Sequence, residues 1–555
     1  MKKYLKNTVI GVIVAIAVVS CNNYLENTPE NVVLSQTLDY TNVSPSSMYA
    51  TVSGVYANLA SQGGGSSYSN TNNSTDGISH WASWMAYNIR SIDINKGGSS
   101  PGDQALLLSM HNFDYSSVAN TWIGFYAWNC AYNCIFTANA ALQALAQYAP
   151  NCTTSVEKAN NAKYQGEVKV LRDLCWFNCI RMWGLGLMSS DNTALASSTL
   201  APLEGNNAYQ YLISDLNTAI PNLPNIAPSQ QTDHPGAVTA LTAHLLKAKI
   251  FMDMAGSDNT SVYLDSVIVE TNAVISTNAC ALYADYYNLF KIPGKLCSES
   301  LYEMQYNVNS TMSNPVVLTN AWYSCQGPGT MIGSLKGVNP GKSYGTWPAF
   351  IEPEPAFVSF LSGRNDTLRA RTDVISLQQY TDATGSVTGS AGTKYGLTTE
   401  GDIMINSNNN PYCNGKAYTP STQGQAGNLD YGANNNIRVL RYADVLLLYA
   451  EAALRKPGAG GSTAANAAIY LNQVQSRAKI APTLNPAVKD VLEERRAEFW
   501  SEWGEQFFDV ARLGTSYLTS IGYDGIPTGY DNTKRYLPIP SSAISSNPNL
   551  PTVVQ

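Results

Sequence analysis

Apolar periodicity constrains the fold of this chain more than any other feature. Seven stretches carry apolar residues at intervals of three and four, the spacing of one face of an α-helix. Most of them end beside a proline or a glycine, as helices do. Strand patterns are few, so the chain is predicted to be mostly α-helical. The stretches cover about residues 120–148, 157–183, 208–220, 237–254, 438–455, 462–478 and 486–513.

The periodicity weakens between residues 258 and 436, where glycine, asparagine and proline are frequent. Long loops inside a compact domain usually carry function, so we expect ligand-binding loops here. The expected organisation is a single domain over residues 21–555. Its parts are an N-terminal helical part over about 21–300, a loop-rich insertion over about 300–436 and a C-terminal helical region over about 437–555.

Residues 1–20 have the pattern of a bacterial lipoprotein signal peptide. Three lysines lie within the first six positions, residues 8–19 form a short apolar run, and Cys21 follows small and apolar residues. The run is shorter than the roughly 20 residues of a membrane-spanning helix. We therefore expect Cys21 to be acylated and to anchor the mature chain to a membrane; the alternative is an ordinary secretory signal.

Charge is scarce in this chain. Only 13% of the residues are Asp, Glu, Lys or Arg, about half the usual share, and the formal net charge is -7. Because no basic patch stands out, the sequence argues against nucleic acid as a ligand. Asn, Ser, Thr and Gly, with 34 Tyr and 10 Trp, replace the missing charge. Such a surface suits neutral, polyhydroxylated ligands.

Nine cysteines remain once Cys21 is set aside, an odd number that cannot pair completely. Two pairs are spaced i, i+4 on predicted helices, so four sulfurs could meet between two helices. A tetrathiolate zinc site is one reading of that arrangement; buried core residues or an interhelical disulfide is the favoured one. The prediction is therefore no metal and no cofactor. The nine are Cys130, Cys134, Cys152, Cys175, Cys179, Cys280, Cys297, Cys325 and Cys413.

Motifs for catalysis are missing from the sequence. None of the four histidines forms a metal-binding pattern, and no G-x-S-x-G segment occurs. A glycosidase could use two carboxylates, but the acids of the C-terminal helices each have an arginine nearby in sequence. We expect them to form a partly buried ion-pair network and the protein to be no enzyme. The expected members are Arg441, Asp444, Glu451, Glu494, Arg495, Glu498, Asp509 and Arg512.

Several segments, in order along the chain, resemble one known family. They are residues 21–26 (CNNYLE), the helix over 166–184, the segment IRVLRYADVLLLYAEA over 437–452, the acids and arginines of 494–512, and YLPIP over 536–540. Together they resemble the SusD/RagB family of nutrient-binding lipoproteins of Bacteroidetes.

The resemblance implies a mostly α-helical, SusD-like fold with four tetratricopeptide-like helix pairs and long ligand-binding loops. It implies a lipoprotein of the outer membrane, exposed at the cell surface, that binds an oligosaccharide. The implied partner is a SusC-like TonB-dependent transporter. The alternative is a peptide-binding lipoprotein of the RagB branch that serves a peptide transporter.

Aromatic residues in loop-like sequence are the candidates for sugar binding, because an aromatic face can stack on a sugar ring while polar groups take its hydroxyls. Six tryptophans fall on predicted helices and are assigned to the core, and the others lie in loop-like segments. The alternative is that a loop tryptophan only fixes its own loop to the scaffold. The expected stacking residues are Trp81, Trp84, Trp322 and Tyr323, and the expected polar contacts are Asn88, Arg90 and Asp76.

Overall fold

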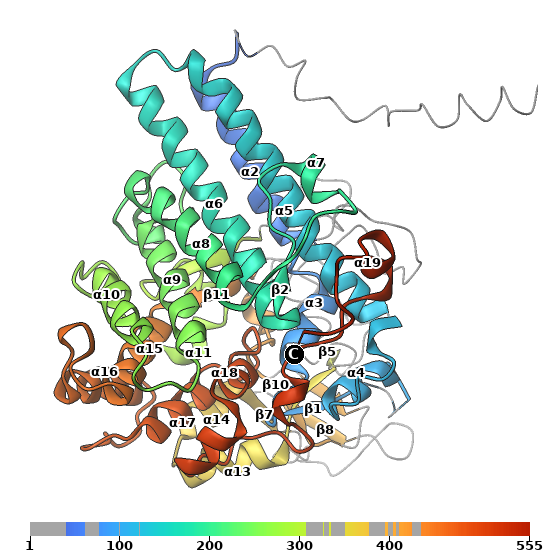
Figure 1. The fold of residues 1–555 in the computed structure, drawn as a ribbon. Coiled ribbons are helices and arrows are strands. Elements are labelled where there is room, and N and C mark those ends of the chain that lie inside the picture. The colour runs from blue at the N-terminus through green and yellow to red at the C-terminus, as the bar shows by residue number, and fades with distance from the viewer. Residues whose placement is uncertain are drawn as a thin grey trace, which may run out of the picture.

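The structure is a computed structural model, and it describes most of the chain after residue 39. The described residues are 40, 42–61, 77–98, 100, 102–120, 122–306, 326, 332–334, 350–376, 394–397, 403–406, 410–423 and 435–554. The mostly helical fold predicted from the sequence is confirmed (Figure 1).

The two longest helices are α5 (Trp122–Tyr148) and α6 (Ser155–Trp183), which pack side by side with α2 (Tyr49–Ala60) against both (Figure 1). The predicted bounds of α5 and α6 are correct to within two residues. A capping box starts α6: Glu157 N donates to Thr154 Oγ1 over 3.2 Å, and Thr154 N donates to Glu157 Oε2 over 2.9 Å. Gly184, with φ of 79°, ends it.

Further helices continue this stack, each packed against the one before it (Figure 1). They are α8 (Gly205–Ala219), α9 (Ala240–Ala255), α10 (Tyr263–Ile275), α15 (Tyr442–Arg455) and α16 (Ala464–Arg477). The stretches predicted near α8, α9, α15 and α16 are thus confirmed as helices. The helix α10 falls in sequence that was expected to be loop-like, so that part of the prediction is wrong.

Two predicted helical stretches are wrong in part. Residues 438–441 belong to the strand β11 (Ile437–Arg441). The stretch over 486–513 is two helices, α17 (Val488–Glu498) and α18 (Glu505–Ser520). The segment between these two helices ends at Gly504, whose φ of 72° is unfavourable for other residues. A Cβ at this position would lie 2.3 Å from the Tyr87 carbonyl oxygen.

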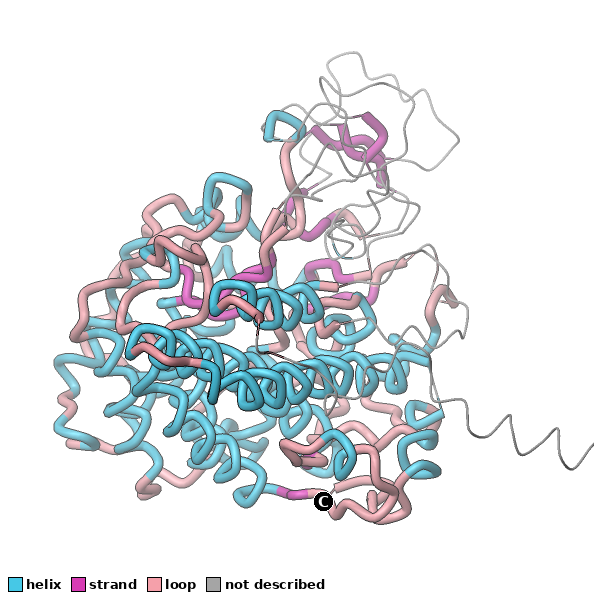
Figure 2. Tube along the Cα trace, turned by 90° about the horizontal axis from the view of Figure 1, so that it is seen from above, coloured by secondary structure: helices cyan, strands magenta, loops and turns pink. Residues whose placement is uncertain are grey.

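The described strands are short and form small antiparallel sheets (Figure 2). The strand β11 pairs with β4 (Ser300–Met304), which joins the N-terminal part to the C-terminal helices. The other pairings are β1 (Ile94–Lys96) with β6 (Ile351–Pro353), β2 (Leu185–Gly186) with β3 (Leu203–Glu204), β7 (Val374–Ser376) with β10 (Tyr412–Asn414), and β9 (Ile403–Asn406) with β5 (Ile332–Ser334) and β8 (Lys394–Leu397).

Shorter helices cover the remaining faces. They are α3 (Trp81–Asn88), α4 (Ala105–His111), α7 (Asn192–Leu195), α11 (Tyr286–Leu289), α13 (Pro355–Gly363), α14 (Thr367–Asp373) and α19 (Ser541–Ser546).

One large hydrophobic cluster runs through the molecule, from Met48 of the first described helical segment to Leu550 near the C-terminus. Backbone bonds also tie the C-terminal segment to α6: Leu537 N donates to Met182 O over 2.8 Å. In the part of the chain that the structure describes, no helix combines the length and apolar character needed to cross a membrane.

Candidate functional site: an aromatic surface beside a buried charge network

Three predicted ligand contacts lie in the core. Residues 81–88 form α3 and not a loop, and Trp84 is fully buried in it. Asn88 is 2% exposed and bridges two backbone groups, donating to Trp84 O and accepting from Gly504 N. Arg90 is fully buried, donates to Arg535 O and lies 4.2 Å from the ring centre of Phe507. This corrects the expectation for Trp84, Asn88 and Arg90, because their surfaces are occupied by the fold itself.

Trp81, the first residue of α3, differs from Trp84 because it is partly exposed. Its ring centre lies 4.7 Å from that of Trp122, at the start of α5. The ring of His80 stacks on Tyr126 at 5.5 Å and 13°, and Trp122 meets Tyr126 edge to face at 6.2 Å. Phe125 joins the group from the same turn of α5. These five residues, His80, Trp81, Trp122, Phe125 and Tyr126, are called the surface aromatic cluster below.

Amide side chains continue this surface along α5. Trp122, Tyr126, Asn129 and Asn133 are spaced four, three and four residues apart, so they share one helix face, and all four are partly exposed. The face thus passes from aromatic rings to amide groups within three turns. The spacing of these four residues can be seen in the sequence. It was missed because the apolar periodicity of the whole stretch predicts that its tryptophans belong to the core.

His80 fixes the junction between the two helices. Its Nδ1 accepts a hydrogen bond from Ala82 N over 3.3 Å and so caps α3. Burial lowers the pKa of His80 to about 4, so the ring is neutral at physiological pH. The aromatic cluster therefore carries no charge of its own.

Asp76, Trp322 and Tyr323, with the lipidation candidate Cys21, lie outside the described residues. Their roles therefore stay predictions.

The predicted ion-pair network is present and buried. Arg495 of α17 donates to Asp444 of α15 over 2.5 Å and to Asp509 of α18 over 2.6 Å. Arg512 of α18 reaches Glu451 of α15 over 2.6 Å. The other predicted members are paired as well, Arg441 with Glu498 and Glu494 with Arg369.

The pairing keeps Glu451 and Glu498 ionised. Burial alone would raise the pKa of Glu451, but Arg512 outweighs it and lowers that pKa to about 2. Glu498 behaves in the same way: Arg477, Arg369 and Arg441 overcome its burial and hold its pKa far below the usual value. A general acid needs a raised pKa, so these carboxylates hold helices together and do not suit glycoside hydrolysis.

The cysteines of α5 and α6 are buried free thiols. Burial raises the pKa of Cys175 and Cys179 well above the usual thiol value, and Cys134 lies close enough to add to the effect. Protonated thiols are poor metal ligands. Over the described ranges, no group of three or more His, Cys, Asp or Glu is arranged to hold a metal ion.

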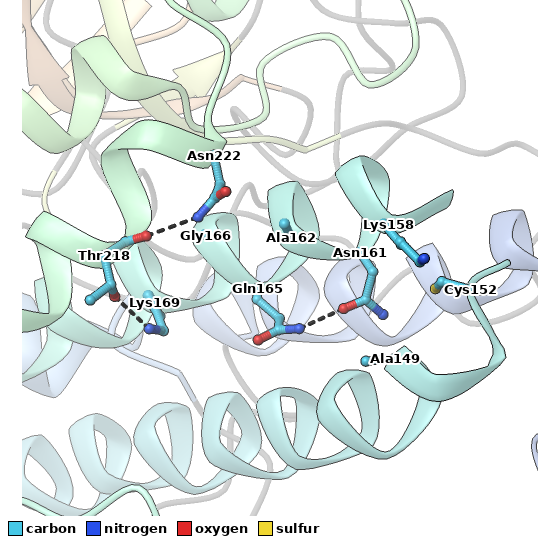
Figure 3. Close-up of a pocket in the computed structure, with 10 residues that line it drawn as sticks. All are labelled: Ala149, Cys152, Lys158, Asn161, Ala162, Gln165, Gly166, Lys169, Thr218 and Asn222. Carbon is cyan, nitrogen blue, oxygen red and sulfur yellow. Dashed lines mark hydrogen bonds between the residues drawn. The ribbon is translucent and has the colours of Figure 1, made fainter. Parts of the chain in front are cut away.

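A polar hollow of about 230 Å³ lies between α6, the end of α8 and the turn after α5 (Figure 3). Its polar side chains bond to one another: Gln165 donates to Asn161 Oδ1 over 2.5 Å, and Lys169 donates to Thr218 Oγ1 over 2.6 Å. None of the residues that line it has an aromatic ring. The hollow is therefore less suited to stacking on a sugar than the surface aromatic cluster.

The C-terminal third of the chain matches a known family. The model of the SusD family matches residues 364–554. A SusD-like protein of Bacteroides ovatus is 26% identical over 444 residues, which is 76% of this chain and 72% of that protein. A SusD-like protein P2 of Formosa agariphila is 30% identical over 141 residues, 23% of this chain and 27% of that protein.

Solved structures share the fold. Surface glycan-binding protein A from Bacteroides uniformis superposes with a TM-score of 0.69 at 21% identity, covering 92% of this chain and 99% of its own. Surface glycan-binding protein A from Bacteroides thetaiotaomicron, in complex with laminarihexaose, superposes with a TM-score of 0.68 at 22% identity. The match covers 91% of this chain and 98% of that protein's chain. Residues 364–554 thus carry the match to the SusD family model, and the chain as a whole is similar in sequence to a SusD-like protein and in fold to these two glycan-binding proteins.

Proposed function

We propose that this protein is a surface lipoprotein that captures oligosaccharides and delivers them to a SusC-like TonB-dependent transporter. The surface aromatic cluster is the observation that carries the proposal. The rings of Trp81, Trp122, Phe125 and Tyr126 are partly exposed and offer faces for sugar rings. The amides of Asn129 and Asn133 on the same face of α5 can bond to hydroxyls. The laminarihexaose complex of a relative with this fold supports the ligand class.

The neutral character of the cluster favours a neutral sugar. His80 is uncharged, and no charged side chain belongs to the five residues of the cluster. Stacking without ion pairs gives modest affinity, since sugars must first lose bound water. Capture would then depend on closure of this protein over the transporter. Trp322, Tyr323 and Asp76 remain proposed additional contacts.

The remaining parts of the proposal concern location and architecture. Residues 1–20 are removed as a signal peptide, and the acylated Cys21 holds the domain over 21–555 on the outer membrane at the cell surface. The four tetratricopeptide-like pairs of the scaffold are proposed to lie among the helices α5 to α10 and α15 to α18. The protein binds and transfers its ligand without chemical change, which fits the role of its buried carboxylates as ion-pair partners.

Calorimetric titration with a panel of neutral glycans, including laminarihexaose, tests the proposal. Trp81→Ala and Trp122→Ala should each weaken binding at least tenfold, because each removes a stacking face. Tyr263→Ala, which removes a partly exposed ring from α10, is the matched control and should bind like the wild type. Binding that survives both tryptophan substitutions would refute the site. If no glycan gives a binding signal and mixed peptides do, the peptide-binding alternative is supported instead.

A further inference from the structure

A second cavity, of about 400 Å³, lies between α2, the turn over residues 233–237 and the end of β4. It shares no lining residue with the surface aromatic cluster. Its volume lies in the range of small-molecule sites, and a mono- or disaccharide would fit it. Its lining combines aromatic rings with short or polar side chains, and the most relevant of these are Tyr49, Ser53, Ala57, Asp233, His234 and Gln305.

Stacked rings form one wall of this cavity. Tyr49 and His234 lie face to face, with ring centres 3.3 Å apart and planes within 4°, and both are partly exposed. Tyr164 meets the ring of Tyr49 edge-on at 5.0 Å. Burial, together with the nearby charge of Lys163, lowers the pKa of His234, so the ring is neutral at physiological pH. The wall is thus an uncharged aromatic surface.

Hydrogen bonds behind the wall hold it in place. The hydroxyls of Tyr49 and Tyr56 both donate to Glu167 Oε2, over 3.2 and 3.0 Å. The Tyr56 hydroxyl also accepts from Val238 N over 2.8 Å. Because Glu167 is 1% exposed and sits on the long helix α6, these rings are oriented before any ligand arrives. Binding to such a surface loses little side-chain entropy.

The rim of the cavity supplies polar groups. Ser53, Asp233 and Gln305 are exposed there, and the Gln305 amide is held by a bond from its Nε2 to Pro235 O over 3.0 Å. Among the described residues that line the cavity, none is Lys or Arg. An anionic ligand would meet the negative charge of Asp233 at the rim, whereas the hydroxyl groups of a sugar can donate to this carboxylate.

From this combination we infer that the cavity is a second saccharide-binding site, in which the Tyr49–His234 stack carries a sugar ring and the rim residues bind its hydroxyls. The inference rests on the proposed function. A long oligosaccharide that reached both sites would be held more tightly than by either site alone.

The test is calorimetric titration of the purified protein with laminarihexaose. Ala57→Arg, on the exposed face of α2, fills the cavity, and His234→Ala removes half of the stack. Each should lower the apparent affinity three- to tenfold or remove one of two binding events. Ser214→Arg, which adds the same charge at an exposed position of α8, is the matched control, and Trp81→Ala is titrated beside them. Circular dichroism checks that every variant is folded.

The outcomes separate the two proposals. Weakened binding in both cavity variants, with Ser214→Arg unchanged, supports the second site. If both cavity variants bind like the wild type while Trp81→Ala loses binding, the second site is refuted and the proposed function stands. If only the cavity variants lose binding, the cavity is the main site and the surface aromatic cluster is not. If the wild type binds no saccharide, the proposed function fails and the inference fails with it.

Discussion

The buried carboxyl group of Glu167 should make the stability of the protein depend on pH near neutrality. Burial raises the pKa of Glu167 from 4.5 to about 7, although the hydroxyls of Tyr56 and Tyr49 partly offset this. The folded protein therefore keeps the proton at pH values where the unfolded chain has released it. Linkage then requires the free energy of unfolding to fall as pH rises through this window.

The size of the effect follows from the two pKa values. The whole difference corresponds to about 3 kcal/mol. Between pH 5 and pH 7 the unfolded carboxyl is mostly ionised and the folded one mostly is not, so about 2 kcal/mol of stability should be lost. Glu167→Gln removes the titration but keeps an oxygen that can accept from both tyrosines.

Urea unfolding at pH 5, 6, 7 and 8, followed by circular dichroism, measures this directly. The difference in unfolding free energy between wild type and Glu167→Gln should change by about 2 kcal/mol from pH 5 to pH 7 and little above pH 8. Glu204→Gln, the same change at an exposed position, should follow the wild type at every pH. A difference between wild type and Glu167→Gln that stays constant over the whole range would refute the argument.

Three further predictions concern single positions of the structure. Trp84→Ala should lower the unfolding free energy by about 3 to 5 kcal/mol because it opens a core cavity, whereas Trp81→Ala should change it much less; thermal melts compare them. Gly504→Ala should lower the free energy of unfolding by at least about 2 kcal/mol, because φ at this position is 72° and the new Cβ would lie 2.3 Å from a carbonyl oxygen of α3. A melting temperature within a degree of the wild type would contradict this. Burial and the charge of Asp215 raise the pKa of Asp173 well above its usual value, so the stability of the wild type should fall as pH rises from 4 to 8. In urea titrations, Asp173→Asn should make stability less dependent on pH. An unchanged pH dependence in this variant would contradict the prediction.

The long helices were predictable because their local signals agree with their packing. In α6 the capping box at Thr154 and the glycine at 184 mark both ends, and the apolar residues between them lie in a helix that is buried on every side from residue 170 to residue 183. The errors fall where tertiary contacts decide. Residues 438–441 (RVLR) lead directly into the apolar run of the next helix, so the local pattern assigns them to that helix, and only pairing with β4 makes them part of β11. The break before α18 depends on the approach of α3 to Gly504, which no local pattern reveals.

The candidate site was predictable only in part, for a related reason. The sequence around Trp81 and Trp84 lacks a full amphipathic repeat, so it suggested a loop with two equivalent tryptophans. The short helix α3 instead turns one ring into the core and leaves the other at the surface. Conversely, Trp122 begins a stretch whose overall periodicity indicates burial, yet it stands at the helix end where the core stops. Exposure at such positions depends on neighbours that are distant in sequence.

The buried ion-pair network also has a consequence for how the chain folds. Glu498 is shared by Arg369, Arg441 and Arg477, which come from α14, β11 and α16, segments separated by long stretches of sequence. A charge that leaves water before its partner arrives is strongly destabilising. Intermediates in which only one of these segments has docked are therefore disfavoured. The C-terminal helices should assemble in one cooperative step, and the network selects the correct arrangement of segments more than it adds to final stability.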